Sequence, residues 1–155
     1  MTLLNPDHQA PPKWHDTLPI TSRYTYGLAG ERFFRALQNQ GQILGTWCRQ
    51  CKRLYVPGRL YCERCLNELT EWEDVGLTGE LHAFTVLHVN LDGSRKTVPD
   101  VVGFVKFGDG GIVHKLHVSD PSTVKIGMLV EAVLKPASQR EGSILDILYF
   151  KPVAI

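Results

Sequence analysis

The 155-residue sequence has no long hydrophobic run. Its most apolar stretch, residues 144–150, is far shorter than the ~20 residues that a membrane-spanning helix needs. The first ten residues are polar and lack the apolar segment of a signal peptide. We therefore expect a cytoplasmic protein without a membrane partner, in a compartment where thiols stay reduced.

The sequence also lacks an excess of either charge, with a formal net charge of +1 at pH 7. Proteins that neutralise many phosphates carry a basic excess, so the charge of the whole chain argues against DNA or RNA as its partner. No serine lies in a nucleophile elbow, and no glycine-rich loop leads into a helix as a phosphate cradle does. We predict no catalytic residue in this chain.

Cysteine is absent outside two CxxC pairs, Cys48/Cys51 and Cys62/Cys65. Two such pairs bring four thiolates to one ion in a tetrahedral shell, and reduced paired CxxC units indicate metal rather than disulfides. Four thiolates leave no open position for water, so we predict one structural zinc ion. Iron in a rubredoxin-like site, which would indicate electron transfer, is the alternative that the same sulfur geometry allows.

The sequence pattern of residues 1–42 predicts an irregular arm followed by a short helix. Prolines break the segment 1–22, where Trp14 is apolar enough to dock on a partner. Glu31 suits the first turn of a helix that ends at Gly41. One apolar face of this helix gathers Phe33, Phe34 and Leu37.

Residues 43–70 predict a zinc ribbon, and residues 71–155 predict a β-barrel. Short strands at the spacing of an OB-fold are expected in five ranges: 81–88, 101–107, 112–118, 128–134 and 144–150. Gly108-Asp109-Gly110-Gly111 predicts a hairpin turn. Residues 90–100 are expected to form a loop, and its Arg95 and Lys96 could reach a phosphorylated ligand or a partner.

Other polar residues offer weaker signals. The ribbon carries basic side chains at positions 49, 52, 53, 59 and 64, which favour either a phosphate-binding patch, RNA binding included, or a solvated face. His82 and His88 share one strand face, whereas His114 and His117 face opposite ways. No carboxylate lies at a metal-ligand spacing beside them, so we interpret these histidines as ordinary barrel-face residues rather than a proton relay or second metal site.

Four blocks in a fixed order resemble the zinc-ribbon OB-fold proteins that accompany thiolases. They are residues 24–34 (YTYGLAGERFF), the CxxC block 48–65 with its central VPGR, residues 71–86 beginning EW and ending GELHAFTV, and residues 125–130 (KIGMLV). The likeness covers most of residues 24–150. The chain departs from the family pattern at Lys52 and Leu66, where a glycine often follows each CxxC.

The resemblance implies a mainly β protein with a short N-terminal helix, a rubredoxin-like zinc ribbon and a C-terminal OB-fold. It implies a non-catalytic subunit beside a thiolase-fold protein that supplies the nucleophilic cysteine, in a hetero-oligomer that binds acyl-CoA. Family members act on aromatic and steroid compounds, and benzoylsuccinyl-CoA cleavage in anaerobic toluene degradation is the specific reaction expected. Residues expected to contact CoA are Arg53, Arg59, Arg95 and Lys96. Residues expected to contact the partner are Trp14, Tyr24, Tyr26, Phe33, Phe34 and Leu37.

Overall fold

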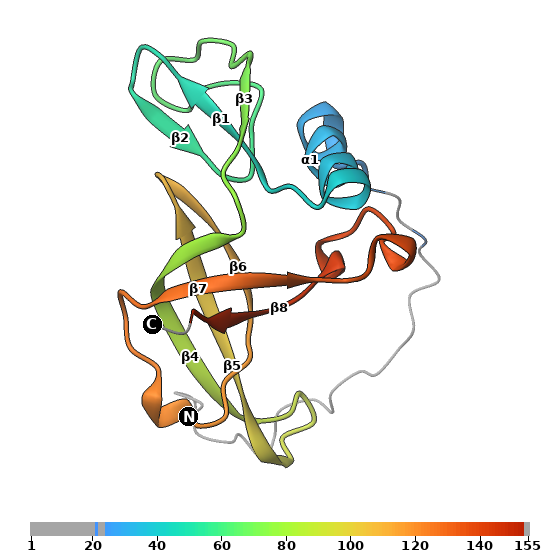
Figure 1. Ribbon diagram of the computed structural model, residues 1–155, viewed down its shortest axis with the longest axis vertical. Coiled ribbons are helices and arrows are strands. Elements are labelled where there is room, and N and C mark those ends of the chain that lie inside the picture. Colours follow the sequence, from blue (N-terminus) through green and yellow to red (C-terminus); the bar gives the residue numbers. More distant parts are fainter. Residues whose placement is uncertain (1–20, 22–23, 154–155) are drawn as a thin grey trace, which may run out of the picture.

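A computed structural model describes residue 21 and residues 24–153 of the chain. It contains one α-helix, a three-stranded sheet and a closed five-stranded barrel (Figure 1). The helix and the small sheet lie side by side at one end of the molecule, and the barrel forms the rest. The predicted fold class, mainly β with one helix, is confirmed.

Helix α1 (Gly27–Gln40) ends at Gly41, as the sequence predicts. Gly41 has a φ of 69°, its backbone N–H donates to the carbonyl of Leu37 at 3.1 Å, and the N–H of Gln42 donates to the carbonyl of Ala36 at 3.3 Å, which closes the last turn. The prediction for Glu31 is wrong, because the helix starts earlier and no acidic residue lies in its first turn. Glu31 instead pairs with Arg35 one turn further on, at 2.7 Å.

The small sheet is antiparallel and has the strand order β2-β1-β3. Its strands are β1 (Leu44–Cys48), β2 (Arg53–Tyr55) and β3 (Glu71–Asp74). Strand β1 is central, because it pairs with β2 on one side and with β3 on the other. This pairing leaves the cysteine turns at one end of the sheet.

The barrel follows the order β4-β5-β6-β8-β7 and closes back on β4. Its strands are β4 (Thr78–Val89), β5 (Arg95–Phe107), β6 (Gly110–Leu116), β7 (Leu129–Leu134) and β8 (Ile147–Pro152). The parallel contact between β6 and β8 joins Leu116 to Phe150. Two irregularities in the pairing of β4 with β5 bend the long strand, as closure requires.

Two strand predictions are corrected by the structure. Strand β5 begins at Arg95, so the expected loop over residues 90–100 is a tight turn followed by paired strand. The last strand begins at Ile147 rather than at residue 144. A short 3₁₀ turn (Ile144–Asp146) precedes it, because Ser143 and Asp146 form a capping box that favours a helical start.

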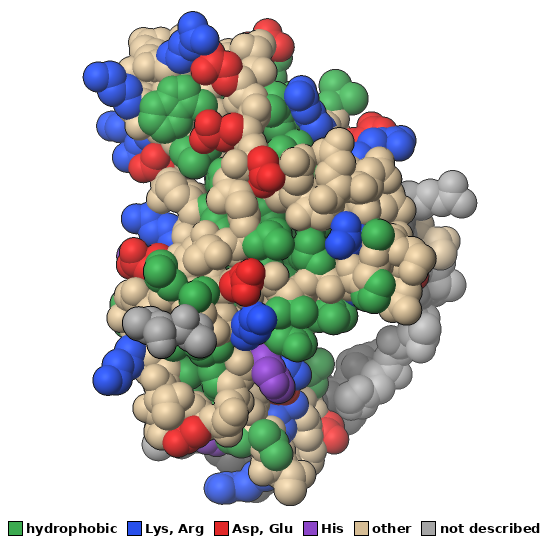
Figure 2. Space-filling view, in the orientation of Figure 1, with side chains coloured by type: hydrophobic (Ala, Val, Ile, Leu, Met, Phe, Trp, Pro, Cys, Tyr) green, Lys and Arg blue, Asp and Glu red, His purple; other side chains and the backbone are tan. Residues whose placement is uncertain are grey.

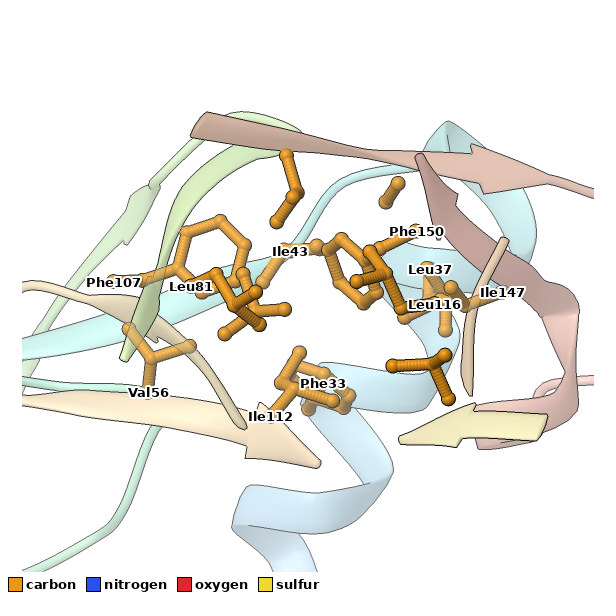
Figure 3. Packing of buried hydrophobic residues seen from close by; sticks show 14 of the residues in the cluster. Phe33, Leu37, Ile43, Val56, Leu81, Phe107, Ile112, Leu116, Ile147 and Phe150 are labelled. Carbon is orange, nitrogen blue, oxygen red and sulfur yellow. The ribbon is translucent and has the colours of Figure 1, made fainter. Parts of the chain in front are cut away.

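Helix α1 and the barrel share one hydrophobic core. Phe33 and Leu37 of the helix pack with barrel side chains that include Leu81 and Phe150, and all four are at most 2% exposed (Figure 3). Burying such side chains contributes roughly 1.5–3 kcal/mol each. The helix is therefore an integral part of the folded unit and not an appendage.

Candidate metal centre

The four cysteines occupy two turns that face each other across the end of the small sheet. Cys48 closes β1, and its Sγ accepts a hydrogen bond from the backbone N–H of Cys51 at 3.4 Å. In the second turn, Sγ of Cys62 accepts from the N–H of Arg64 at 3.4 Å. Such N–H···S bonds stabilise thiolates and hold each sulfur in place.

The sulfur atoms have the spacing of a tetrahedral metal shell. Sγ of Cys48 lies 3.6 Å from Sγ of Cys65, and Sγ of Cys62 lies 3.7 Å from Sγ of Cys51. All four sulfurs lie within 4.8 Å of one another. A tetrahedron with metal–sulfur bonds of about 2.3 Å has sulfur–sulfur edges of about 3.8 Å. The four cysteines are therefore positioned to bind a metal ion.

Tyr55 of β2 adds a contact that the sequence did not reveal. Its side chain is buried, and its hydroxyl donates to Sγ of Cys62 at 3.2 Å. This hydrogen bond lowers the pKa of Cys62 to about 6 and raises the pKa of Tyr55 to about 12. Burial instead raises the pKa of Cys51 to about 12. Thiols so close together cannot all ionise unless a cation compensates their charge, which is what a metal ion supplies.

The end of the small sheet that carries the four cysteines, which we call the metal end, has little hydrophobic core of its own. Its buried cluster consists of Cys48, Tyr55, Cys62 and Leu69, separate from the core of helix and barrel. Two of these four side chains are metal-ligand candidates. We therefore expect this end of the molecule to depend on the metal for its order.

Strand β2 joins the metal end to the barrel through the turn between β5 and β6. The backbone N–H of Leu54 donates to a carboxylate oxygen of Asp109 at 3.0 Å, and the N–H of Asp109 donates to the carbonyl of Leu54 at 3.0 Å. The N–H of Gly111 donates to the carbonyl of Val56 at 2.8 Å. A side chain at Gly110 would collide with the backbone of Val56. The glycine-rich hairpin turn thus also fixes the position of the small sheet.

The residues expected to contact CoA do not form one site. Arg59 of the metal end pairs with Glu63 at 2.7 Å, and Arg53 lies nearby on β2. Lys96 pairs with Asp100 at 2.9 Å and Arg95 is exposed at the start of β5. The turn between β4 and β5 lies at the opposite end of the molecule from the small sheet (Figure 1). Two separate groups of cations therefore remain, one at each end.

The residues expected to contact a partner fall into a buried group and an exposed group. Phe33 and Leu37 are buried inside this chain, so the prediction that they present a partner-binding surface is wrong for these two. Tyr24 and Tyr26 are 92% and 62% exposed, and Phe34 is half-buried with its ring against Tyr26. Trp14 and the expected arm of residues 1–22 lie outside the described residues, apart from residue 21.

Charge is mixed on the face shown in Figure 2, where acidic and basic side chains alternate over the metal end. Two ion pairs of the small sheet and its turns join Arg49 to Glu71 and Arg59 to Glu63. Among residues 24–153 the four cysteines are the only group of potential metal ligands that comes together, so the histidines form no second cluster. Within the same residues, no helix is long and apolar enough to cross a membrane.

Comparison with known proteins identifies the type of fold of the barrel. Residues 72–135 match the family model of the ChsH2 C-terminal OB-fold domain. The barrel is an OB-fold, and this part of it is similar to the ChsH2 domain. The chain is also similar to two DUF35 domain-containing scaffold proteins over most of its length. The one from Methanocaldococcus jannaschii is 29% identical over 127 residues, which cover 79% of this chain and 89% of the relative. The one from Methanothermobacter thermautotrophicus is 29% identical over 126 residues, 78% of this chain and 94% of the relative.

Two solved structures share the fold. A DUF35-family protein of unknown function from Sulfolobus solfataricus superposes with a TM-score of 0.63 at 22% identity, covering 81% of this chain and 84% of that one. A chain of the Ltp2-ChsH2(DUF35) aldolase superposes with a TM-score of 0.59 at 23% identity, covering 84% of this chain and 98% of that one. Each of these likenesses covers more than four fifths of this chain.

Proposed function

We propose that this chain is a non-catalytic, zinc-stabilised subunit of a hetero-oligomeric thiolase-type enzyme that acts on an acyl-CoA. The observation that carries the proposal is the metal centre, because its four thiolates use every cysteine of the chain and leave no position for a substrate. The scaffold role named for both archaeal relatives, and the paired Ltp2-ChsH2 aldolase, support a part in organising an enzyme subunit.

Within this proposal the chain has three parts. Residues 1–42 hold the partner-binding segment, residues 43–70 hold the zinc ribbon, and residues 71–155 hold the barrel, preceded by β3, which joins the small sheet of the ribbon. The exposed rings of Tyr24 and Tyr26, with half-buried Phe34, supply an apolar surface of the kind that a partner covers. The partner provides the catalytic cysteine, and the two subunits bind the CoA together in the cytoplasm. The specific reaction we propose is benzoylsuccinyl-CoA cleavage, with this chain as the small subunit of that thiolase.

Co-expression with the matching thiolase-fold protein tests this role. We expect a stable complex that survives size-exclusion chromatography and contains one zinc ion for each copy of this chain. The double variant Tyr24→Ser/Tyr26→Ser should weaken the complex, whereas Tyr61→Ser, a similarly exposed tyrosine at the metal end, should not. A monomer that never co-purifies with the thiolase contradicts the proposal. Salt-sensitive binding of single-stranded RNA would instead favour the alternative, a free-standing RNA-binding protein.

A further inference from the structure

Strand β4 has a long free edge. On one side β5 runs along it from Glu80 to Val89, whereas on the other side β7 pairs only with residues 78–80. Hydrogen bonds from the loop before β7 then reach Leu81. Among the described residues, no strand pairs with residues 82–89 on that second side. We call residues 82–89 the free β4 edge.

The free β4 edge carries none of the residues that keep an exposed edge from pairing. Its sequence, HAFTVLHV, contains no lysine, arginine, carboxylate, proline or glycine. Native sheets place charges or proline on exposed edges, because the unpaired N–H and C=O groups there offer a template to any other strand. An uncharged segment of aromatic and β-branched residues pairs most readily with another chain.

The second strand of the same hairpin provides an internal comparison. Strand β5 pairs with β6 only from Val101 onward, so residues 95–100 form an edge of their own, which we call the β5 edge. Its sequence, RKTVPD, contains three charged residues and a proline. Lys96 and Asp100 form an ion pair at 2.9 Å. The β5 edge is therefore protected against pairing and the free β4 edge is not, which indicates that a strand covers the free β4 edge.

The side chains of the free β4 edge define the strand that fits beside it. Phe84 and Val86 are half-buried and pack against the barrel core. Thr85 and Leu87 alternate with them and are exposed on the opposite face, Leu87 to 40%. A covering strand is therefore uncharged, with apolar side chains on the face that continues the core. Strand β4 itself meets this description.

We propose that the free β4 edge pairs antiparallel with the same edge of a second copy of this chain, in a two-fold dimer. Because neither edge carries a charge, this pairing sets no like charges opposite each other. A two-fold axis perpendicular to the sheet keeps the same face of both strands on the same side, so Phe84 and Val86 of the two copies form one apolar layer. The dimer is closed, since each copy uses its unprotected edge for the other.

This dimer does not rest on the proposed function. The β4–β5 hairpin reaches the end of the molecule opposite helix α1 and the small sheet (Figure 1). The exposed rings of Tyr24 and Tyr26, which precede the helix, are therefore left free for a different partner. The chain alone tests the dimer, so either proposal can fail while the other stands.

Light scattering by the full-length, zinc-containing chain, from micromolar to millimolar concentration, tests the dimer. We expect a monomer–dimer equilibrium with a Kd of roughly micromolar order, as for a small interface. Thr85→Lys places a lysine of each copy near the middle of the paired edges and should weaken dimerisation at least about tenfold. Thr97→Lys, at an exposed threonine of the β5 edge, should change it less than about twofold.

Hydrogen exchange of the wild-type chain locates the contact and stands even if Thr85→Lys fails to fold. Amides of the free β4 edge that face away from β5 should exchange more slowly as the protein concentration rises, whereas those of the β5 edge should not change. Far-UV circular dichroism and zinc content identical to wild type show that a lysine variant keeps its fold.

Three results overturn the proposal. One is a wild-type chain that stays monomeric at millimolar concentration. Another is an equal effect of Thr85→Lys and Thr97→Lys on dimerisation. The third is protection of the free β4 edge that does not depend on concentration, which means that the chain covers its own edge, or that appears only when a thiolase-fold protein is added, which means that the partner covers it.

Discussion

Single side chains around the four cysteines should decide how firmly a metal ion is held there, and Tyr55 is the clearest case. Tyr55→Phe keeps the buried ring but removes the hydrogen bond to Sγ of Cys62. Losing a partner of this kind weakens metal affinity by roughly 10-fold or more. We expect faster zinc release to a chromogenic chelator, and a red-shifted sulfur-to-metal band in the cobalt-substituted protein.

Tyr61→Phe is the matched control for this variant, because Tyr61 precedes the second CxxC pair and is 59% exposed. It should leave both the release rate and the cobalt spectrum unchanged. Equal rates for the two variants would show that the hydroxyl of Tyr55 does not support the metal site.

Lys52 and Leu66 follow the two CxxC pairs, and both have left-handed backbone, with φ of 51° and 60°. Glycine adopts this conformation without the steric cost that a side chain brings. Leu66→Gly should therefore raise the free energy of unfolding, by up to about 1 kcal/mol in urea titrations at saturating zinc. Leu145→Gly, at a similarly exposed leucine without positive φ, should lower it by about 0.5–1 kcal/mol. Destabilisation by Leu66→Gly would contradict the argument.

His114 links stability to pH. Its Nδ1 atom is buried without a hydrogen-bond partner among the described residues, and burial lowers the pKa of the imidazole. The unfolded chain therefore binds a proton at this histidine more readily than the folded chain does. The free energy of unfolding falls as the pH drops from the ordinary histidine pKa of about 6.5 towards the lowered pKa of His114. His114→Gln should flatten this part of a plot of unfolding free energy against pH, whereas the exposed His88→Gln should not. Identical slopes in all three proteins would contradict it.

Among the elements, the β5–β6 turn has two roles, and only one of them could be predicted from the sequence. The motif Gly108-Asp109-Gly110-Gly111 predicted the hairpin correctly, since local turn chemistry determines it. Its second role depends on strand β2, more than fifty residues earlier, and no local pattern indicates that contact. The one available signal was that the motif holds more glycine than a hairpin turn requires.

Gly110→Ala tests this junction. The added Cβ would meet the backbone of Val56, which cannot move without breaking the hydrogen bond to Gly111. We expect a loss of about 1–3 kcal/mol in the free energy of unfolding. Gly93→Ala is the control, because Gly93 lies in the β4–β5 turn with open space around it, although its positive φ carries a cost of its own. A loss for Gly110→Ala no larger than that of Gly93→Ala would contradict a packed junction.

Helix α1 illustrates the same limit. Its end and its apolar positions could be predicted from Gly41 and from the spacing of Phe33 and Leu37. What covers those positions could not, because an apolar stripe fits a partner as well as it fits the same chain. The structure buries both side chains against the barrel and leaves Tyr24 and Tyr26 exposed.

At the scale of the whole molecule, the four ligand positions and the class of the barrel were predictable. Cysteine spacing determines the first, and alternating strands with turn signals indicate the second. The contact of Tyr55 with Cys62 and the free β4 edge were not predictable, since each depends on which elements meet after folding.

Removing the metal should loosen one end of the molecule and spare the other. The metal end has only a small buried cluster, whereas the barrel and helix share an extensive core. After chelation, hydrogen exchange should accelerate in residues 48–70 and remain slow in β5 and β6. Cooperative loss of protection across the entire chain would show that the metal supports the whole fold.

If, as we propose, this chain completes a thiolase-type enzyme, the reactive cysteine lies in another subunit and the reaction needs both chains. The most direct measurement is the thiolysis rate of the thiolase-fold partner with acyl-CoA and CoA, with and without this chain, beside native mass spectrometry of the mixture. We expect a hetero-oligomer with zinc in this chain, and a thiolysis rate that depends on the presence of this chain. A partner that is fully active alone, beside a monomer of this chain in the same mixture, would contradict it.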